Sequence, residues 1–382
     1  MMKFIDWIII SKKLFSIIMS NIKNPTNILI FRGGQLGDTL AAVPALWVLR
    51  DLYPNAHITL LYDNHVNENH VSPRQVLEGS GLIDSFVHYN VYASSKICSY
   101  IQYAILYFKL LKNKFDMLAY LPGSGKIDFL VNRDLKFFRL LGISNIVGHI
   151  GLRGSLYIEN YHEPITLENE SGHLLTRLSK SEIPIPSKGL LRSDLNLRED
   201  ELKFAKNWIN GHSASKGKIL VALGIGSKFD EKKWATENYI SIVKNLIEKF
   251  DICPIIFGGK EDLGLAKEVI KDWKRGLIGA GKFNIRESAS LMNYCSLYLG
   301  NDTGTMHLAS SEGVPCVSIF SGRDFPGAWY PFGDNHQEFR VPYSCEDIPN
   351  GKCTNCSGLC LESINQDEVL EACIKLISNK LN

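Results

Sequence analysis

Short apolar runs that end directly in a glycine-rich loop recur in both halves of this sequence. Residues 27–31 (NILIF) and 218–223 (KILVAL) each lead into a loop with at least two glycines. Apolar residues at helical spacing follow, in 39–52 and in 236–250. A buried strand, a glycine loop and then a helix are typical of parallel α/β domains. The pattern therefore predicts two such domains, with a ligand site beyond the carboxyl ends of their strands.

The same alternation continues along the chain and gives an expected order of elements. Strands are expected at 27–31, 57–62, 84–88, 115–121, 145–148, 218–223, 252–257, 296–299 and 314–320. Helices are expected at 39–52, 74–80, 97–113, 126–141, 172–180, 200–211, 236–250, 261–271, 285–294, 305–312 and 365–379. Because one domain rarely exceeds ~250–300 residues, and because the stretch 182–189 has the proline and serine of a linker, we divide the 382 residues into 1–20, 21–190, 191–364 and 365–382.

Composition narrows the class of partner and the compartment. Lys and Arg number 42 and Asp and Glu number 40, a formal net charge of +2. That balance gives no global basic field, so nucleic acid is not an expected partner. The nine cysteines are an odd number without a secretion signal, which favours a reduced, cytoplasmic setting.

The first 20 residues are apolar, but Asp6, Lys12 and Lys13 interrupt them. They lack the ~18 uninterrupted apolar residues of a spanning helix. Two interpretations stand. The segment is an interfacial helix on a membrane surface, or it is an extension upstream of a true start at Met19.

The segment Asn301-Asp302-Thr303-Gly304-Thr305-Met306-His307 follows an expected strand and opens an expected helix. The first N–H groups of a helix have no partner within it and carry partial positive charge, so they bind anions. Gly304 lets a phosphate approach the backbone. The alternative is a plain helix cap by Asp302 that needs no ligand.

Two further loops carry charged residues next to glycine. Gly226-Ser227 is followed by Lys232, and lysine is a compact charge suited to phosphate; the alternative is a solvated basic turn. In the first loop, Asp38 follows Gly37. The spacing there is not the GxGxxG dinucleotide fingerprint, so Asp38 is either a helix cap or a general base at the cleft.

Two clusters remain. Glu261 and Asp262 follow Gly258-Gly259, where a carboxylate can accept hydrogen bonds from a ribose diol. Four thiols lie near the C-terminus, and they are either a structural zinc site or reduced thiols in a loop: Cys345, Cys353, Cys356 and Cys360. No His–Glu pair near them points to catalytic zinc, and no cofactor is expected to be required.

With these motifs in view, the sequence resembles glycosyltransferase family 9, the ADP-heptose:lipopolysaccharide heptosyltransferase family. Four stretches carry the resemblance in the family's order: 28–61, 221–242, 257–270 and 299–333. The last is the most specific, with NDTG, His307, GVP and an ending in WYPFG.

The resemblance implies the GT-B fold, in which two Rossmann-like domains face each other across a cleft. Residues 21–190 would bind the acceptor and residues 191–364 the nucleotide sugar, while the helix in 365–382 would return to the first domain. The implied reaction is transfer of a sugar, here heptose from ADP-heptose, with inversion and without metal. The acceptor would be a lipopolysaccharide core or a related lipid-linked glycan, at the cytoplasmic face of the inner membrane.

The resemblance also assigns roles to single residues. Asp38 is the implied base, and the implied donor contacts are Gly226, Ser227, Lys232, Glu261, Asp262, Asp302, Thr303, Gly304 and His307. Arg32 and Gln35 are expected to contact the acceptor, and Lys136 and Arg139 to contact its phosphates. The alternative to those last two is a solvated helix face. Two other functions stay open: a nucleotide-sugar epimerase of the same fold, and a nucleotide-sugar-binding protein without turnover.

Overall fold

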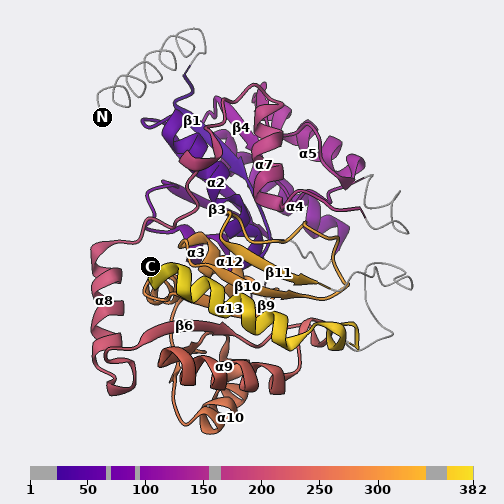
Figure 1. The fold of residues 1–382 in the computed structure, drawn as a ribbon. Helices are drawn as coiled ribbons and strands as arrows, with labels where there is room; N and C mark the ends of the chain where they lie inside the picture. The colour runs from indigo at the N-terminus through magenta and orange to yellow at the C-terminus, as the bar shows by residue number, and fades with distance from the viewer. Residues whose placement is uncertain (1–23, 66–69, 91–94, 155–164, 341–358, 382) are drawn as a thin grey trace, which may run out of the picture.

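The computed structural model describes residues 24–65, 70–90, 95–154, 165–340 and 359–381. Two parallel β-sheets lie one above the other, each covered by helices on both faces (Figure 1). This is the two-domain α/β architecture expected from the sequence. None of the helices in these ranges has the length and apolar character needed to span a membrane.

The first sheet has the strand order β3-β2-β1-β4-β5, with every neighbouring pair parallel. Its strands are β1 Asn27–Phe31, β2 His57–Asn64, β3 Ser85–Asn90, β4 Met117–Tyr120 and β5 Asn145–Val147. Its helices are α2 Leu36–Leu52, α3 Pro73–Leu77, α4 Lys96–Leu111, α5 Asp128–Leu140 and α7 Glu170–Ser179. Helices α4 and α5 pack on one face of the sheet, and α2, α3 and α7 pack on the other.

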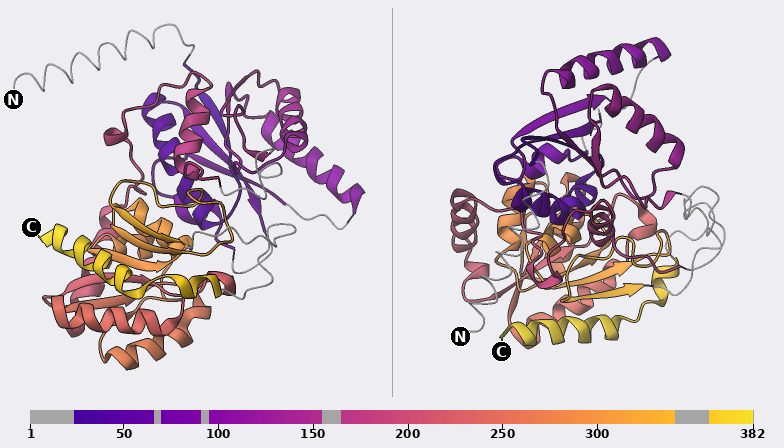
Figure 2. Two further views of the ribbon diagram at one scale, coloured as in Figure 1. Left: turned by 45° about the vertical axis from the view of Figure 1, so that its right-hand side comes forward. Right: turned by 90° about the horizontal axis from the view of Figure 1, so that it is seen from above.

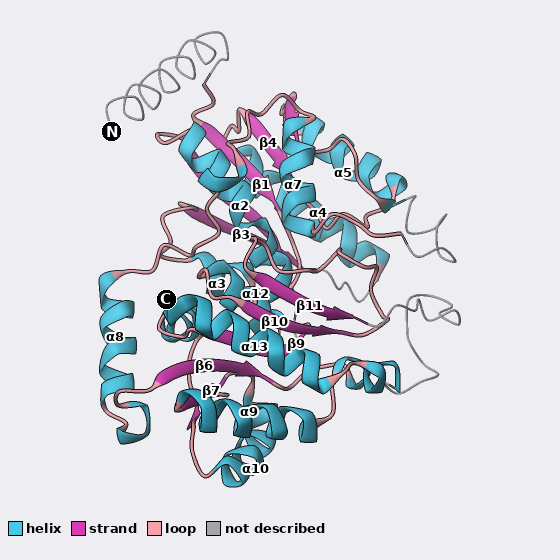
Figure 3. Ribbon diagram, in the orientation of Figure 1, coloured by secondary structure: helices cyan, strands magenta, loops and turns pink. Residues whose placement is uncertain are grey.

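The second sheet has the order β11-β10-β9-β6-β7-β8, again all parallel. Its strands are β6 Ile219–Gly224, β7 Ile252–Ile256, β8 Leu277–Ile278, β9 Leu297–Asn301, β10 Cys316–Phe320 and β11 His336–Arg340. Its helices are α8 Glu199–Asn210, α9 Thr236–Phe250, α10 Leu263–Trp273, α11 Ile285–Met292, α12 Gly304–Ser311 and α13 Gln366–Leu381. Figure 3 shows the two sheets and their helices in contrasting colours.

Two strands escaped the sequence analysis. Strand β8 has only two residues, and β11 carries the sequence HQEFR. A short or polar edge strand has no continuous apolar run to mark it. The expected elements otherwise occur in the expected order, with ends that differ by a few residues.

The last helix corrects one prediction. Helix α13 was expected to return to the first domain, but its buried stripe packs against α9, β9 and β10 of the second domain. That stripe consists of Val369, Ala372, Cys373, Leu376 and Ile377. Lys380 near its end donates a hydrogen bond to the carbonyl of Cys295, also in the second domain. The two views of Figure 2 show α13 along that sheet.

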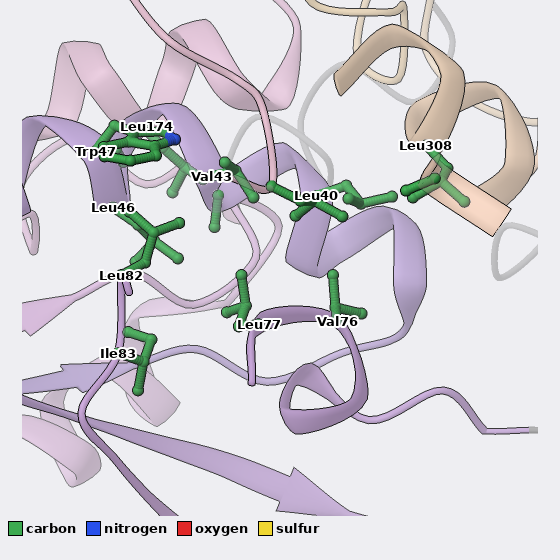
Figure 4. Packing of buried hydrophobic residues seen from close by; sticks show 14 of the residues in the cluster. Leu40, Val43, Leu46, Trp47, Val76, Leu77, Leu82, Ile83, Leu174 and Leu308 are labelled. Atoms are coloured by element: carbon green, nitrogen blue, oxygen red, sulfur yellow. The ribbon is translucent and has the colours of Figure 1, made fainter. Parts of the chain in front are cut away.

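The domains share one hydrophobic core across their interface. It runs from α2 and α3 of the first domain to α11 and α12 of the second. Figure 4 shows Leu40 of α2 and Leu308 of α12 in this continuous cluster. The contact between α2 and α12 matters for function, because both helices begin at a glycine loop.

A buried arginine fastens the linker between the domains. Arg286 of α11 forms a double ion pair with Glu201 of α8, at 2.6 and 2.8 Å. Its guanidinium also donates to the carbonyls of Leu195 and Asn196, in the connection that runs from the 182–189 linker to α8, and of Val76 in the first domain. One side chain therefore holds both domains and the segment that joins them.

Candidate functional site

A cleft of about 1060 Å³ lies between the two domains. Its walls come from the loops after β1, β6, β7 and β9 and from the segment 323–329. Eleven of the residues singled out from the sequence line it: Gln35, Asp38, Gly226, Ser227, Lys232, Glu261, Asp262, Asp302, Thr303, Gly304 and His307. The structure therefore gathers the expected catalytic and donor-binding residues, which are distant in sequence, around one space.

Asp38 lies in the first turn of α2, where it faces the cleft. Its Oδ2 accepts a hydrogen bond from the backbone N–H of Gln35 at 3.0 Å, which closes the helix start. Its side chain keeps 31% of its surface exposed. Burial by the surrounding protein raises the pKa of the Asp38 carboxyl, while the Arg32 guanidinium and the Gln35 N–H lower it. A carboxylate with a raised pKa is a stronger proton acceptor than an ordinary aspartate.

Arg32 does not line the cleft. It is 1% exposed, and its guanidinium donates to the carbonyls of Asp38 and Leu121 and to the carboxylate of Glu170. Its Nη2 lies 3.7 Å from Asp38 Oδ1. The structure therefore places Arg32 behind Asp38, where it positions that residue, and the predicted contact with the acceptor is not what the structure shows.

Asp63, at the end of β2, forms a hydrogen bond with the glycine loop that follows β1. Gly34 has φ +117°, a conformation that favours glycine, and its N–H donates to Asp63 Oδ1 at 2.8 Å. His65 Nε2 lies 2.9 Å from Asp63 Oδ2, and His65 stacks on His70. Among the described residues these three form the one group whose ligand atoms converge as a metal site requires. The Asp63–His65 contact is equally that of an ordinary hydrogen bond, which needs no metal.

Across the cleft, α12 begins at the expected anion-binding loop. Thr303 is the N-cap residue, and its hydroxyl bonds the hydroxyl of Thr305 at 2.8 Å. Asp302 does not cap the helix, because its carboxylate turns to Lys232. Plain capping by Asp302 is therefore wrong. Thr303, Gly304 and Thr305 line the cleft, and α12 has no acidic residue in its first turn, so the partial positive charge of the helix start lies at the cleft.

Lys232 projects from the loop after β6 between two carboxylates. Its Nζ lies 2.6 Å from Asp302 Oδ2 and 2.7 Å from Asp324 Oδ2. Burial acts against its charge, but the two carboxylates outweigh burial and raise the pKa of Lys232. The ammonium is therefore fixed in the charged form beside the start of α12. Asp324 lies within the family-like stretch 299–333, but no role was expected for it from the sequence.

Asn301 organises the walls from which these side chains project. It is fully buried, and its Oδ1 accepts from the Trp234 N–H and from the Tyr239 hydroxyl, while its Nδ2 donates to the carbonyl of Ile225. One amide thus ties the end of β9 to the loop after β6. Asn301 belongs to the motif seen in the sequence, but no role was expected for it.

Asp262 fills the floor of the glycine loops after β6 and β7. A β-carbon at Gly226 would lie 2.0 Å from Asp262 Oδ1, so only glycine fits there. The N–H of Gly259 donates to Asp262 at 2.9 Å. Burial raises the pKa of Asp262, and the N–H of Gly259 lowers it. Glu261, its neighbour, is exposed at the rim.

Other cleft residues escaped the sequence analysis. Arg323 stacks over the Phe229 ring at 3.7 Å and pairs with Glu231. Lys228 Nζ donates to Gln35 Oε1 at 3.0 Å, a hydrogen bond between the two domains. In each of these contacts the two partners lie 90 residues or more apart in the sequence, so no local sequence pattern could have predicted the contact.

His307 lies one turn into α12 with its ring in the cleft wall. The ring stands edge-on to Trp329, with 6.0 Å between centroids. Burial, with the charge of Lys232, lowers the pKa of His307 to about 4. The imidazole is therefore neutral near pH 7, and it can donate one hydrogen bond and accept one.

The remaining predicted residues lie away from the cleft or outside the described ranges. Lys136 and Arg139 are exposed on α5 and do not line the cleft. Residues 1–20 and Cys345, Cys353 and Cys356 fall outside the described residues, and of Cys360 only the backbone, in a short 3₁₀ turn, is described. The interfacial helix and the structural zinc therefore stay predictions.

Comparison with known proteins agrees with this geometry. The model of glycosyltransferase family 9 (heptosyltransferase) matches residues 137–355. Lipooligosaccharide heptosyltransferase 2 of Campylobacter jejuni serotype O:2 is 23% identical over 90% of this chain and 96% of its own length.

Two solved structures share the fold. The family 9 glycosyltransferase of Veillonella parvula aligns with a TM-score of 0.67 at 20% identity, covering 93% of this chain and 97% of the other. The ADP-heptose LPS heptosyltransferase II of Escherichia coli aligns with a TM-score of 0.64 at 18% identity, covering 93% and 100%. The fold is thus GT-B, and the chain belongs to glycosyltransferase family 9, the heptosyltransferase family.

Proposed function

We propose that this chain transfers a heptose, with inversion, from ADP-heptose to a hydroxyl of a lipopolysaccharide-core acceptor. One observation carries the proposal: a carboxylate of raised pKa, Asp38, shares a cleft with a helix start and a fixed ammonium, Lys232. Asp38 can accept the proton of a nucleophilic hydroxyl, and the helix start and Lys232 can stabilise the negative charge of a departing diphosphate.

In this reaction the proton passes to Asp38 and the negative charge develops on the leaving diphosphate. The acceptor oxygen attacks the anomeric carbon from the face opposite the diphosphate, and its proton passes to Asp38. The bond from the anomeric carbon to the diphosphate oxygen breaks, and its electron pair leaves with the nucleotide. Lys232 and the N–H groups at the start of α12 stabilise the negative charge that develops there. The nucleotide diphosphate and the protonated Asp38 complete the balance.

The remaining cleft residues have roles in holding the donor. The glycines after β6 and β7 leave room for the nucleotide, and Glu261 or Asp262 would accept hydrogen bonds from its ribose. Neutral His307 would bond a sugar or phosphate oxygen beside Lys232. Gln35 lines the first-domain side of the cleft and would contact the acceptor together with Asp38.

The setting follows from the acceptor. A lipid-linked core is a membrane molecule, so we place the enzyme at the cytoplasmic face of the inner membrane, as a peripheral protein. The Escherichia coli protein that shares the fold is an ADP-heptose enzyme, which supports the choice of donor.

The first test asks which nucleotide the donor site binds. Ligand-induced thermal stabilisation is measured with ADP, UDP, GDP and CMP, since a ligand at 100 times its Kd adds about 2.7 kcal/mol. ADP alone should stabilise the protein. A shift with UDP or GDP instead would reject heptose as the donor sugar while keeping the reaction type.

The second test is transfer itself. With ADP-heptose and a core acceptor, we expect a glycoside with the anomeric configuration opposite to that of the donor, read by NMR. A free sugar product without an acceptor would favour the epimerase alternative. ADP binding with no turnover on any acceptor would favour the binding protein.

A further inference from the structure

Helix α4 exposes a complete apolar face on the outside of the first domain. Six large side chains on it are 42–74% exposed: Ile97, Tyr100, Ile101, Ile105, Phe108 and Leu111. Their spacing of three, one, four, three and three residues puts them on one side of a helix. We refer to these six residues as the α4 face. Soluble monomers rarely expose a contiguous patch of this kind without a partner.

The other side of α4 is well anchored, so this exposure is a property of the folded domain. Leu106 and Leu110 are buried in the core beneath the first sheet. Tyr107 packs its ring against Phe137 of α5 and donates its hydroxyl to the carbonyl of Leu140. A helix that is apolar on both its buried and its exposed sides needs a second apolar environment.

Helix α5 extends the same surface next to α4. Phe129 and Leu140 are 75% and 72% exposed. Around them on the solvent side stand the exposed cations Lys136 and Arg139, the residues first considered as acceptor contacts. Figure 2 shows the two helices at the periphery of the first domain.

The charge of this region favours an anionic partner. From Ser85 to Phe115 the sequence has no Asp or Glu, and it has lysines at 96, 109, 112 and 114. Lys109, Lys112 and Lys114 are exposed at the end of α4. Isoleucine and aromatic side chains with flanking lysines are the composition of helices that lie in a membrane interface. A two-fold contact between copies would instead set these lysines against one another.

We propose that the α4 face, with Phe129, Leu140 and the adjoining cations of α5, is a docking surface for a bilayer that contains anionic lipids. The apolar side chains enter the boundary between headgroups and acyl chains, and the cations meet the headgroup phosphates. The surface is separate from the nucleotide cleft, so this binding does not depend on the transfer reaction.

The topology links the two sites. Helix α4 follows the carboxyl end of β3 at Asn90, and α5 follows the carboxyl end of β4 at Tyr120. Asp38 also follows a carboxyl end, that of β1, and carboxyl ends of parallel strands share one edge. Both helices therefore start at the edge of the sheet that borders the cleft. This step alone rests on the proposed function: a bilayer at α4 would present a lipid-linked acceptor at the edge where Asp38 lies.

The test is co-sedimentation of the full chain with vesicles of phosphatidylcholine, with and without phosphatidylglycerol. The wild type should sediment with the anionic vesicles. Ile105→Ser with Phe108→Ser should weaken that binding by about tenfold or more, because two large apolar side chains leave the interface. Lys109→Glu with Lys112→Glu should weaken it mainly at low salt. Leu190→Ser removes an equally exposed side chain, 68%, elsewhere and should change nothing.

Three results would overturn the proposal. The first is failure of the wild type to bind either kind of vesicle. The Ile105/Phe108 variant could bind as the wild type does, which would assign binding to another segment. Or that variant could turn a dimer into a monomer in sedimentation velocity with vesicle binding unchanged, which would make the face a contact between copies. An unchanged Tm of each variant reports an intact fold, and failure of ADP binding or of transfer activity affects none of these measurements.

Discussion

A β-carbon placed on Gly37 would lie 3.0 Å from Cδ2 of His307. The first residue lies in the opening turn of α2 in the first domain, and the second lies in the opening turn of α12 in the second. Gly304 of α12 meets α2 in the same way, since its β-carbon would lie 2.8 Å from Leu36. The two helix starts are therefore packed against each other through glycines, and the cleft is the space beside that contact.

This contact predicts a non-additive pair of substitutions. Alanine stabilises a helix interior over glycine by about 0.5–1 kcal/mol, but at Gly37 the new methyl group meets the His307 ring. We expect Gly37→Ala to lower the free energy of unfolding in the wild type and to raise it in a His307→Ala background. A double-mutant cycle from urea unfolding measures the coupling, which should be at least about 0.5 kcal/mol. Additive effects would mean that the helix starts do not touch.

Lys232 predicts a contrast between neighbouring lysines. Lys232 is 13% exposed between Asp302 and Asp324, whereas Lys233 is 44% exposed and pairs with Asp230 on the surface. Loss of a charge-assisted bond to a diphosphate costs about 1.5–3 kcal/mol, or roughly 10- to 100-fold in Kd. We expect that loss of ADP affinity for Lys232→Ala in calorimetric titration, and almost none for Lys233→Ala. Equal affinities in the two variants would remove Lys232 from the donor site.

The environment of Asp38 predicts the acid side of the pH profile. A general base works only when deprotonated, so kcat/KM falls as pH drops through its pKa. Burial raises the pKa of Asp38, so the fall should occur at a higher pH than for an ordinary aspartate near 4. Arg32 lowers that pKa, so Arg32→Gln should move the fall to still higher pH.

The controls for Asp38 use two further variants. Asp38→Asn should abolish transfer at every pH while ADP still stabilises the protein. Arg32→Lys keeps the positive charge, and its profile should lie between those of the wild type and Arg32→Gln. An acid limb that stays in place in Arg32→Gln would show that another group controls it.

The cleft and most elements were predictable because their signals are local. Asp38, Lys232 and the start of α12 each follow an apolar run and a glycine loop. Each of these patterns spans about ten residues of sequence. Asp324 also follows a glycine after an apolar run, but its partner Lys232 lies 92 residues away, and Glu201, the partner of Arg286, lies 85 residues away, so no local pattern shows either ion pair. Arg32 looked like a free cation beside a site, but a position directly after a central strand buries it. Local patterns identify loops and their chemistry, whereas the direction of a side chain at a domain interface depends on tertiary packing.

Metal removal tests two separate predictions, one on whether transfer needs a metal and one on whether the C-terminal cysteines bind zinc. The proposed chemistry uses Asp38 and Lys232, so transfer should persist after dialysis against EDTA, assayed in metal-free buffer. Loss of activity that Mg²⁺ restores would contradict this. The same dialysed and undialysed samples decide between zinc and reduced thiols in the C-terminal cluster. Elemental analysis gives about one zinc per chain, lost in Cys353→Ser but not in Cys98→Ser, or it gives none.

Arg286 predicts that the linker is a fixed part of the fold. It is 6% exposed and bonds Glu201, the linker carbonyls and Val76 of the other domain at once. Removing one partner of a buried ion pair leaves the other charge unpaired and costs about 3–5 kcal/mol. We therefore expect Arg286→Leu to lower the free energy of unfolding by about that amount. Arg275→Leu, which breaks the surface pair with Asp251, should leave Tm nearly unchanged. Because Arg286 joins the domains, we expect one unfolding transition for the wild type and two for the variant in calorimetry. A single unshifted transition in the variant would show that the shared core alone holds the domains together.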